Sequence, residues 1–348
     1  MDDFVDSRLD DADALAAADP VLRPIAEAGA RVRREAALAA SAVAALDDSD
    51  RPRAVIAFGP EARLLRAVLE PTCPVPFMAW PRLGLPGWVG PLDVVVVMGW
   101  GSLESCAAAY EAVRRGSRLV VACPPDSPLA RQSASPATTL LPTSSGDAVA
   151  AAIVTLSALH RLGLGPGVHP DQVADVMDDV ATRSSYALDV TQNPAKTAAL
   201  KLAEAQPLVW GGSILAARAS RRIAEALRSA SGRVVLSADA SALLPLVDAV
   251  APRDVFADPF EDAPPGLRPA LVMVDDGMDD EAASEERARL EDFAAARDVT
   301  VCKVGHAQGS AVERYVAVLQ QGLFASAYLQ IGLGRPGRTG DGLAQSGA

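Results

Sequence analysis

The sequence predicts an α/β fold with two successive parallel β-sheets, each flanked by helices. Short apolar runs alternate with helical segments along most of the 348 residues, which is the pattern of βα units joined by right-handed crossovers. Residues 93–99 form a continuous apolar run, typical of a central parallel strand covered on both faces. A polar segment with Gly and Pro, at 163–192, interrupts the alternation before it resumes. We therefore expect two domains joined by a linker.

The first domain is expected to follow an N-terminal helical segment at 1–50, which is Ala-rich and broken near Pro20 and Pro24. Prolines flank the segment 75–80, so it is predicted to be an edge strand. The domain itself should span 51–162, with strands at 54–59, 75–80, 93–99, 118–123 and 138–141, and helices at 61–69, 102–115 and 147–162.

The second domain is expected at 193–333. Asn193 can cap a helix whose first residue is Pro194, because Asn accepts from free backbone amides and Pro lacks an N–H. Residues 334–348 are polar and Gly-rich and are predicted to be a disordered tail. The remaining elements are strands at 207–210, 233–237, 269–274 and 299–302, and helices at 214–229, 241–250, 280–297 and 311–330.

Composition excludes several classes of function. The 44 acidic and 32 basic residues give a formal net charge of −12, whereas proteins that bind nucleic acids or anionic membranes need a basic face. Three histidines and four cysteines without a CxxC pair do not make a zinc site. No apolar run reaches the roughly 20 residues that span a bilayer, and the N-terminus has no signal-peptide core. We expect a cytoplasmic protein without metal, cofactor, nucleic acid or membrane contact.

Five segments carry a family resemblance. They include Leu85-Pro-Gly-Trp-Val-Gly-Pro91 within 76–93, the helical stretch 107–112, Asn193-Pro-Ala-Lys196, residues 210–221, and Leu323-Phe-Ala-Ser-Ala-Tyr-Leu-Gln-Ile-Gly332. In this order they resemble the bifunctional phosphoglucose/phosphomannose isomerases, which have two sugar-isomerase (SIS) domains. The resemblance implies a double-SIS fold and a homodimer. The apolar face of the last helix offers a contact for that dimer: Val312, Tyr315, Val316, Leu319, Leu323 and Tyr328.

The chemistry implied by the resemblance needs groups that this sequence largely lacks. The family binds the sugar phosphate in loops of Gly, Ser and Thr at helix N-termini and moves a proton with a Glu, a His and a Lys. The first such loop corresponds to 58–61, where Pro60 removes an N–H donor and Glu61 adds negative charge. Arg228 stands at the position of the catalytic Glu, and no Lys follows Lys303. Hydroxyl positions of the second loop are taken by Met98, Trp100 and Leu103.

The sequence therefore predicts a sugar-phosphate-binding or regulatory SIS-family protein whose catalytic residues are largely lost. The alternative is an active aldose–ketose isomerase that interconverts glucose or mannose 6-phosphate and fructose 6-phosphate with relocated catalytic groups. Glu225, about one helical turn before Arg228, and His306 are the candidates for such groups. A protein whose role is to bind a protein partner is the third possibility.

Two turns are candidate ligand sites. Gly99, Gly101 and Ser102 lie between a strand and a helix, as either a degraded anion site or an ordinary turn with a Ser cap. Gly211, Gly212 and Ser213 open a helix that carries three arginines. We expect a surviving anion site at the second turn, because three acidic residues oppose a phosphate in the first domain and none does so here. Those acidic residues are Glu61, Glu104 and Asp147.

Structural roles are expected for several other conspicuous residues. Lys196 is interpreted as a surface charge at a helix start, and residues 275–286 as a solvated helix N-terminus. His160 and His169 are expected to be structural or solvated. Trp100 lies in the segment that corresponds to the family's second phosphate loop; we expect it to serve packing, although its ring could also cover a ligand pocket there.

Overall fold

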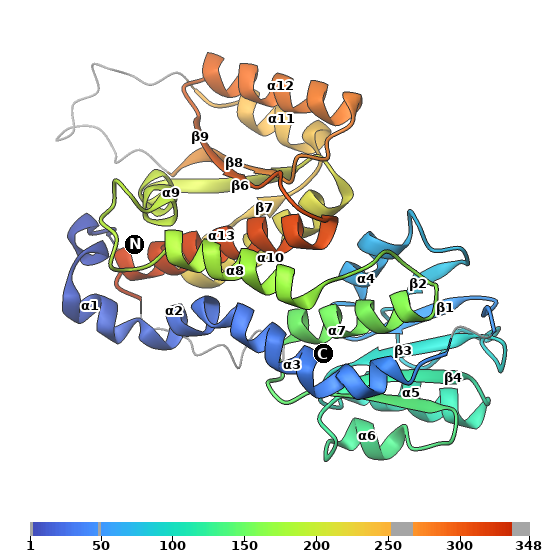
Figure 1. Ribbon diagram of the computed structural model, residues 1–348. Helices are drawn as coiled ribbons and strands as arrows, with labels where there is room; N and C mark the ends of the chain where they lie inside the picture. Colours follow the sequence, from blue (N-terminus) through green and yellow to red (C-terminus); the bar gives the residue numbers. More distant parts are fainter. Residues whose placement is uncertain (1–2, 48–49, 252–266, 336–348) are drawn as a thin grey trace, which may run out of the picture. The chain divides into compact units, whose positions relative to one another are not determined.

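Two parallel sheets flanked by helices confirm the predicted fold class. A computed structural model describes residues 3–47, 50–251 and 267–335, and Figure 1 shows their arrangement. The chain packs as two units, which we treat separately. Unit A contains residues 27–178, and unit B contains residues 3–26 together with 179–335. Most of the predicted tail, from residue 336 onward, lies outside the described residues.

Unit A contains a five-stranded parallel sheet in the order β2-β1-β3-β4-β5. β2 lies at the edge, as its flanking prolines predict. The strands are β1 (Val55–Phe58), β2 (Phe77–Ala79), β3 (Val94–Met98), β4 (Arg118–Cys123) and β5 (Thr138–Pro142). The helices are α3 (Ala28–Ala44), α4 (Ala62–Leu69), α5 (Leu103–Arg114), α6 (Pro128–Gln132) and α7 (Ala148–Arg161).

Helices cover both faces of the unit A sheet (Figure 1). One face packs against α5 and α6, in a core that includes Ile56, Val95, Val121, Ala108 and Leu129. The other face packs against α7, with α3 and α4 beside it. All five residues of β3 are buried, as a central parallel strand requires.

Unit B contains a four-stranded parallel sheet in the order β7-β6-β8-β9. α11 and α12 lie on one face, and α9, α10 and α13 lie on the other (Figure 1). The strands are β6 (Ala205–Gly211), β7 (Leu236–Ser237), β8 (Arg268–Asp275) and β9 (Thr300–Gly305). The helices are α1 (Ala12–Ala17), α2 (Asp19–Ala26), α9 (Pro194–Leu202), α10 (Ile214–Ser231), α11 (Ala240–Asp248), α12 (Glu281–Ala296) and α13 (Ala311–Gly332).

The last helix is buried within its own unit, which corrects one part of the sequence analysis. α13 packs mainly against α10 and α9, and Tyr315 and Tyr328 are completely buried. Of the residues predicted to offer a dimer contact, all but the half-buried Leu323 are buried in this way. The helical spacing of this stripe reflects intramolecular packing, and a homodimer stays a prediction without this contact.

The segment predicted as a linker, 163–192, contains the helix α8 (Pro170–Arg183). Val173, Ala174, Met177 and Val180 recur at helical spacing on its buried side. The predicted N-terminal helical segment is divided, because α1 and α2 belong to unit B and α3 belongs to unit A. No helix in the described ranges is both long and apolar enough to cross a membrane.

Candidate functional site

In each sheet there is one pair of neighbouring strands from which the chain leaves in opposite directions. In open parallel sheets, ligands bind at such a divergence point, outside the carboxyl ends of the strands. In unit A the chain leaves β1 toward β2 and leaves β3 toward β4, so the point lies between β1 and β3. In unit B it lies between β6 and β8. The predicted ligand residues fall at these two positions, one turn in each unit.

The unit A turn brings Gly99, Gly101 and Ser102 together at the carboxyl end of β3. Gly99 and Gly101 have φ values of 126° and 122°, which favour glycine because a Cβ would clash with the backbone. Gly101 also lies against α6, since a Cβ there would be 3.1 Å from the backbone nitrogen of Leu129. Ser102 Oγ accepts from the backbone N–H of Ser105 at 3.2 Å and caps α5. The positive end of the α5 dipole therefore faces this turn.

The charges around the unit A turn differ from those expected. Asp147 caps α7 through Oδ1, and its Oδ2 accepts from Arg31 Nε at 2.8 Å. This ion pair compensates a charge that we expected to repel phosphate. Among the described residues, no acidic side chain hydrogen-bonds to Gly99, Gly101 or Ser102. Trp100 is 57% exposed and its indole packs against Gly146; that the ring covers a ligand at this turn stays a prediction.

The unit B turn is not free of acidic groups, and this expectation is wrong. Ser213 Oγ caps α10 by accepting from Ala216 N and donates to Asp276 Oδ2 at 2.8 Å. A Cβ at Gly212 would lie 2.6 Å from Asp279 Oδ1. Both carboxylates come from the loop after β8, the neighbouring strand, so they occupy the space beside Gly211–Ser213. A phosphate is disfavoured there by like charge.

The acidic stretch at 275–286 is only partly a solvated helix N-terminus. Asp276 is 1% exposed and the Asp279 side chain is 6% exposed. One oxygen from each of Asp275, Asp276 and Asp279 lies within 4.8 Å of the others. Arg287 forms ion pairs with Asp275 and Asp279, so one guanidinium offsets part of the charge of three carboxylates. Such a group of carboxylates can accept hydrogen bonds from hydroxyls.

Two members of this cluster have pKa values displaced in opposite directions. Burial raises the pKa of Asp279, and the charges of Asp275 and Asp276 raise it further, against the opposing effect of Arg287. Burial also opposes ionisation of Asp275, but hydrogen bonds from Arg287 and from the Gly277 N–H outweigh it and lower the pKa of Asp275. Neighbouring carboxyl groups whose pKa values are displaced in opposite directions are typical of proton-transfer sites.

The structure does not bring the two catalytic candidates together. His306 follows β9 at the carboxyl edge, where its backbone N–H donates to Asp275 O at 2.9 Å. Glu225 lies eleven residues into α10, about 16 Å along the helix axis from that edge at 1.5 Å per residue. Glu225 instead pairs with Arg222 at 3.0 Å. Its carboxylate therefore lies beyond the reach of a sugar bound at the strand ends.

Lys196 is a buried residue, although we expected a surface charge at this helix start. Its side chain is 0% exposed, and Nζ donates to Asp10 Oδ1 at 2.7 Å. Nζ also donates to the carbonyls of Tyr186 and Leu188 at 3.1 and 2.7 Å. The ammonium thus fixes the N-terminal segment and the loop before α9 to one point, which is a structural role. Burial raises the pKa of the adjacent Tyr328 to about 12.

Comparison with known proteins finds a family match over part of the chain. Residues 191–335 match the sequence model of the bacterial phospho-glucose isomerase C-terminal SIS domain. The match covers under half of the chain, and it falls on unit B. No curated protein shows a significant sequence match.

Solved structures match most of the chain at low sequence identity. The C-terminal domain of glucosamine-fructose-6-phosphate aminotransferase from Francisella tularensis is similar with a TM-score of 0.59 and 13% identity, over 90% of this chain and 96% of that one. Tagatose-6-phosphate ketose/aldose isomerase from Escherichia coli gives 0.58 and 12%, over 92% and 94%. The chain therefore has the fold of SIS-domain phosphosugar isomerases.

Proposed function

We propose that the chain binds a phosphorylated sugar at the carboxyl edge of the unit A sheet, with the phosphate at Gly99–Ser102, and that it does so without efficient isomerisation. The observation that carries this proposal is the turn itself. It lies at the divergence point of the sheet, its glycines allow close approach of a ligand to the backbone, and the N-terminus of α5 faces it. The similarity to SIS-domain folds supports a sugar phosphate as the class of ligand.

Charge favours the unit A turn over the unit B turn. Two unit charges of like sign about 4 Å apart repel by roughly 4 kcal/mol at an effective dielectric constant of about 20. A phosphate beside Ser213 would meet Asp276 and Asp279, whereas Asp147 in unit A is paired with Arg31. Glu104, in the first turn of α5, and the buried Glu61, at the N-cap of α4, are the acidic residues that we expect to weaken binding in unit A.

The proposal is tested by two substitutions at one residue that differ only in charge. Ser102→Asp and Ser102→Asn both keep a good helix cap, but only the Asp variant places a carboxylate where the phosphate binds. We expect fructose 6-phosphate to bind the native chain with a change in Trp100 fluorescence. Binding should survive in Ser102→Asn with an affinity about ten- to a hundredfold lower, because one hydrogen bond to a charged group is lost.

The comparison of the Ser102→Asp and Ser102→Asn variants separates the effect of charge from the effect of losing the hydroxyl. Ser102→Asp should abolish detectable binding at millimolar ligand, since repulsion adds to the lost hydrogen bond. Unphosphorylated fructose should not bind either variant or the native chain. Equal affinities of the Asp and Asn variants for fructose 6-phosphate would contradict the placement of the phosphate at this turn.

An active isomerase is the second candidate, and the carboxyl cluster of unit B favours it. Asp279 has a raised pKa, and its buried Oδ1 has no hydrogen-bond partner among the described residues. A carboxylate of this kind can serve as a general base, which contributes about 10²–10⁴ in rate. Asp279, rather than Glu225, would then be the relocated base, and the substrate would have to bind at the unit B turn against the negative charge of this cluster.

Turnover distinguishes the two candidates. We expect the native chain to show no interconversion of glucose, mannose and fructose 6-phosphates above the uncatalysed background. Turnover that falls about a hundredfold or more in Asp279→Asn, but not in the exposed control Glu281→Gln, would reject the non-catalytic proposal in favour of the isomerase.

A further inference from the structure

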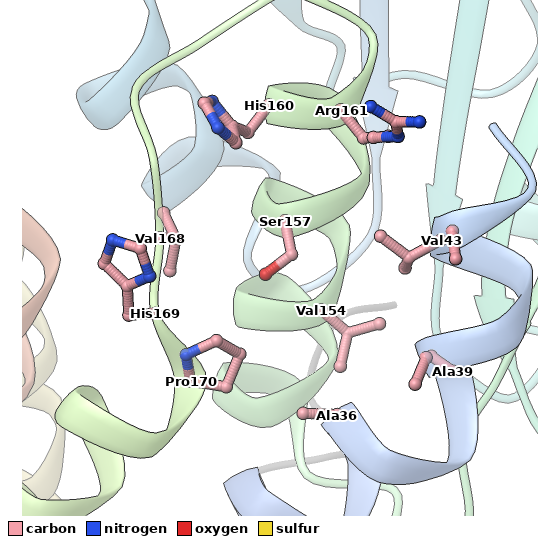
Figure 2. Close-up of a pocket in the computed structure, with 12 residues that line it drawn as sticks. Ala36, Ala39, Val43, Val154, Ser157, His160, Arg161, Val168, His169 and Pro170 are labelled. Carbon is pink, nitrogen blue, oxygen red and sulfur yellow. The ribbon is translucent and has the colours of Figure 1, made fainter. Parts of the chain in front are cut away.

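A groove of about 400 Å³ lies in unit A between α3, α7 and the loop that leads to α8. Figure 2 shows Ala36 and Ala39 of α3 on the side of α7 that carries Val154, and Ser157 of α7 pointing toward the loop that carries Val168 and His169. Small residues on α3 leave this space open, among them Ala36, Ala39, Ala40 and Ala44. The volume is within the range of small-molecule sites, which are mostly apolar with a few polar groups.

Basic side chains border this apolar groove. His160 and His169 lie on the side of the loop and Arg161 on the side of α3 (Figure 2). His160 Nδ1 is 3.0 Å from Gly165 O, so Nδ1 carries a proton and donates it to this carbonyl. Nε2 can then donate to an anion only when the ring is an imidazolium. The Nε2 atoms of His160 and His169 lie 3.7 and 3.8 Å from the position that a Cβ would take at Gly167. A glycine there keeps the space between the two rings open.

The described lining of the groove includes the positive charge of Arg161 and no acidic side chain. The chain has a net charge of −12, yet no Asp or Glu lines this groove within the described residues. Nor does any described residue form a hydrogen bond or ion pair with His169 or Arg161. We infer that the groove binds a small amphipathic anion when its histidines are in the imidazolium form, with an aromatic or aliphatic body on the alanines and its acidic group between His160 and His169.

This site is separate from the proposed phosphate site. α7 begins at the carboxyl edge of the sheet, next to Asp147, and runs back along it. His160 is thirteen residues beyond Asp147, about 20 Å at 1.5 Å per residue. The inference therefore does not depend on sugar-phosphate binding at Gly99–Ser102.

The test uses two fluorescent probes that differ in charge. 1-Anilinonaphthalene-8-sulfonate has an aromatic body and a sulfonate, and N-phenyl-1-naphthylamine is the same body without the acid. At about pH 5.5, where an ordinary imidazole is mostly protonated, we expect the sulfonate to bind the native, folded chain at one site. Its affinity should be at least about tenfold higher than that of the neutral probe, because charged hydrogen bonds are added. The double variant His160→Gln with His169→Gln should remove this preference. Equal affinities of the native chain for both probes would overturn the inference.

A matched pair of substitutions on α3 locates the bound probe. Ala40 and Ala37 are both exposed, but only Ala40 lines the groove. Ala40→Phe should fill the groove and abolish sulfonate binding, whereas Ala37→Phe should leave it unchanged. Circular dichroism of each variant verifies that the chain is folded. Undiminished binding in a folded Ala40→Phe chain would also overturn the inference, because the probe would then occupy another surface.

Discussion

Lys196→Ala is expected to lower the stability of unit B by about 3–5 kcal/mol, the effect of removing the donor of two carbonyls and leaving a cavity. The substitution leaves the carbonyls of Tyr186 and Leu188 without their donor and creates a cavity at a completely buried position. Asp10 is 52% exposed and can be hydrated once the lysine is gone, so the loss falls mainly on the two carbonyls and the cavity.

Native-state hydrogen exchange is the suitable measurement, because the two units need not unfold together. The amides of β6 and β8 should lose protection in Lys196→Ala, while those of β3 and β4 should keep it. Lys201→Ala on the same helix is the control, since Lys201 is exposed. A Lys196→Ala chain that matches this control in the protection of β6 would show that the buried ammonium does not stabilise unit B.

Glu35→Ala is expected to have an effect of similar size in unit A, about 3–5 kcal/mol. Glu35 is completely buried on α3 and accepts from the Ser144 N–H at 2.7 Å, the Ser145 N–H at 2.9 Å and Ser144 Oγ at 3.0 Å. The variant leaves the amides of Ser144 and Ser145 without their acceptor and removes one link between α3 and the loop before α7. One turn earlier on α3, Arg31 pairs with Asp147 in the same region.

The same exchange experiment tests this expectation in the other unit. Protection of the β4 amides should fall in Glu35→Ala while protection of the β8 amides is retained. Glu70→Ala removes an exposed glutamate that pairs with Arg66, and it should change stability by less than about 1 kcal/mol. If Glu35→Ala behaves like Glu70→Ala, the buried carboxylate does not hold α3 to unit A.

The strands could be predicted because local pattern determines them. The run Val94–Val97 can be satisfied only by burial on both faces, and it forms the middle of the first sheet. Prolines identified β2 as an edge strand. The same reasoning missed α8, although its buried residues repeat at helical spacing, because Gly and Pro at its start made the whole segment resemble a linker.

Side-chain partners that lie far apart in the sequence could not be predicted from local pattern. Ser213 and Asp276 are 63 positions apart, and Lys196 and Asp10 are 186 positions apart. The sequence did contain one signal for the contact between Ser213 and Asp276. Asp275 and Asp276 end a strand that is adjacent to β6, and the carboxyl ends of adjacent parallel strands meet at one edge. For Lys196, burial depends on how the N-terminal segment packs, which no pattern in the sequence specifies.

The central claim, that a phosphorylated sugar binds at the carboxyl edge of unit A, is tested most directly by following backbone amides during a titration. In a ¹H–¹⁵N spectrum of the chain, fructose 6-phosphate should shift the amides of Gly99, Gly101 and Ser102 most, and fructose should not. Shifts centred on Gly211–Ser213, or no shifts at millimolar fructose 6-phosphate, would contradict the claim.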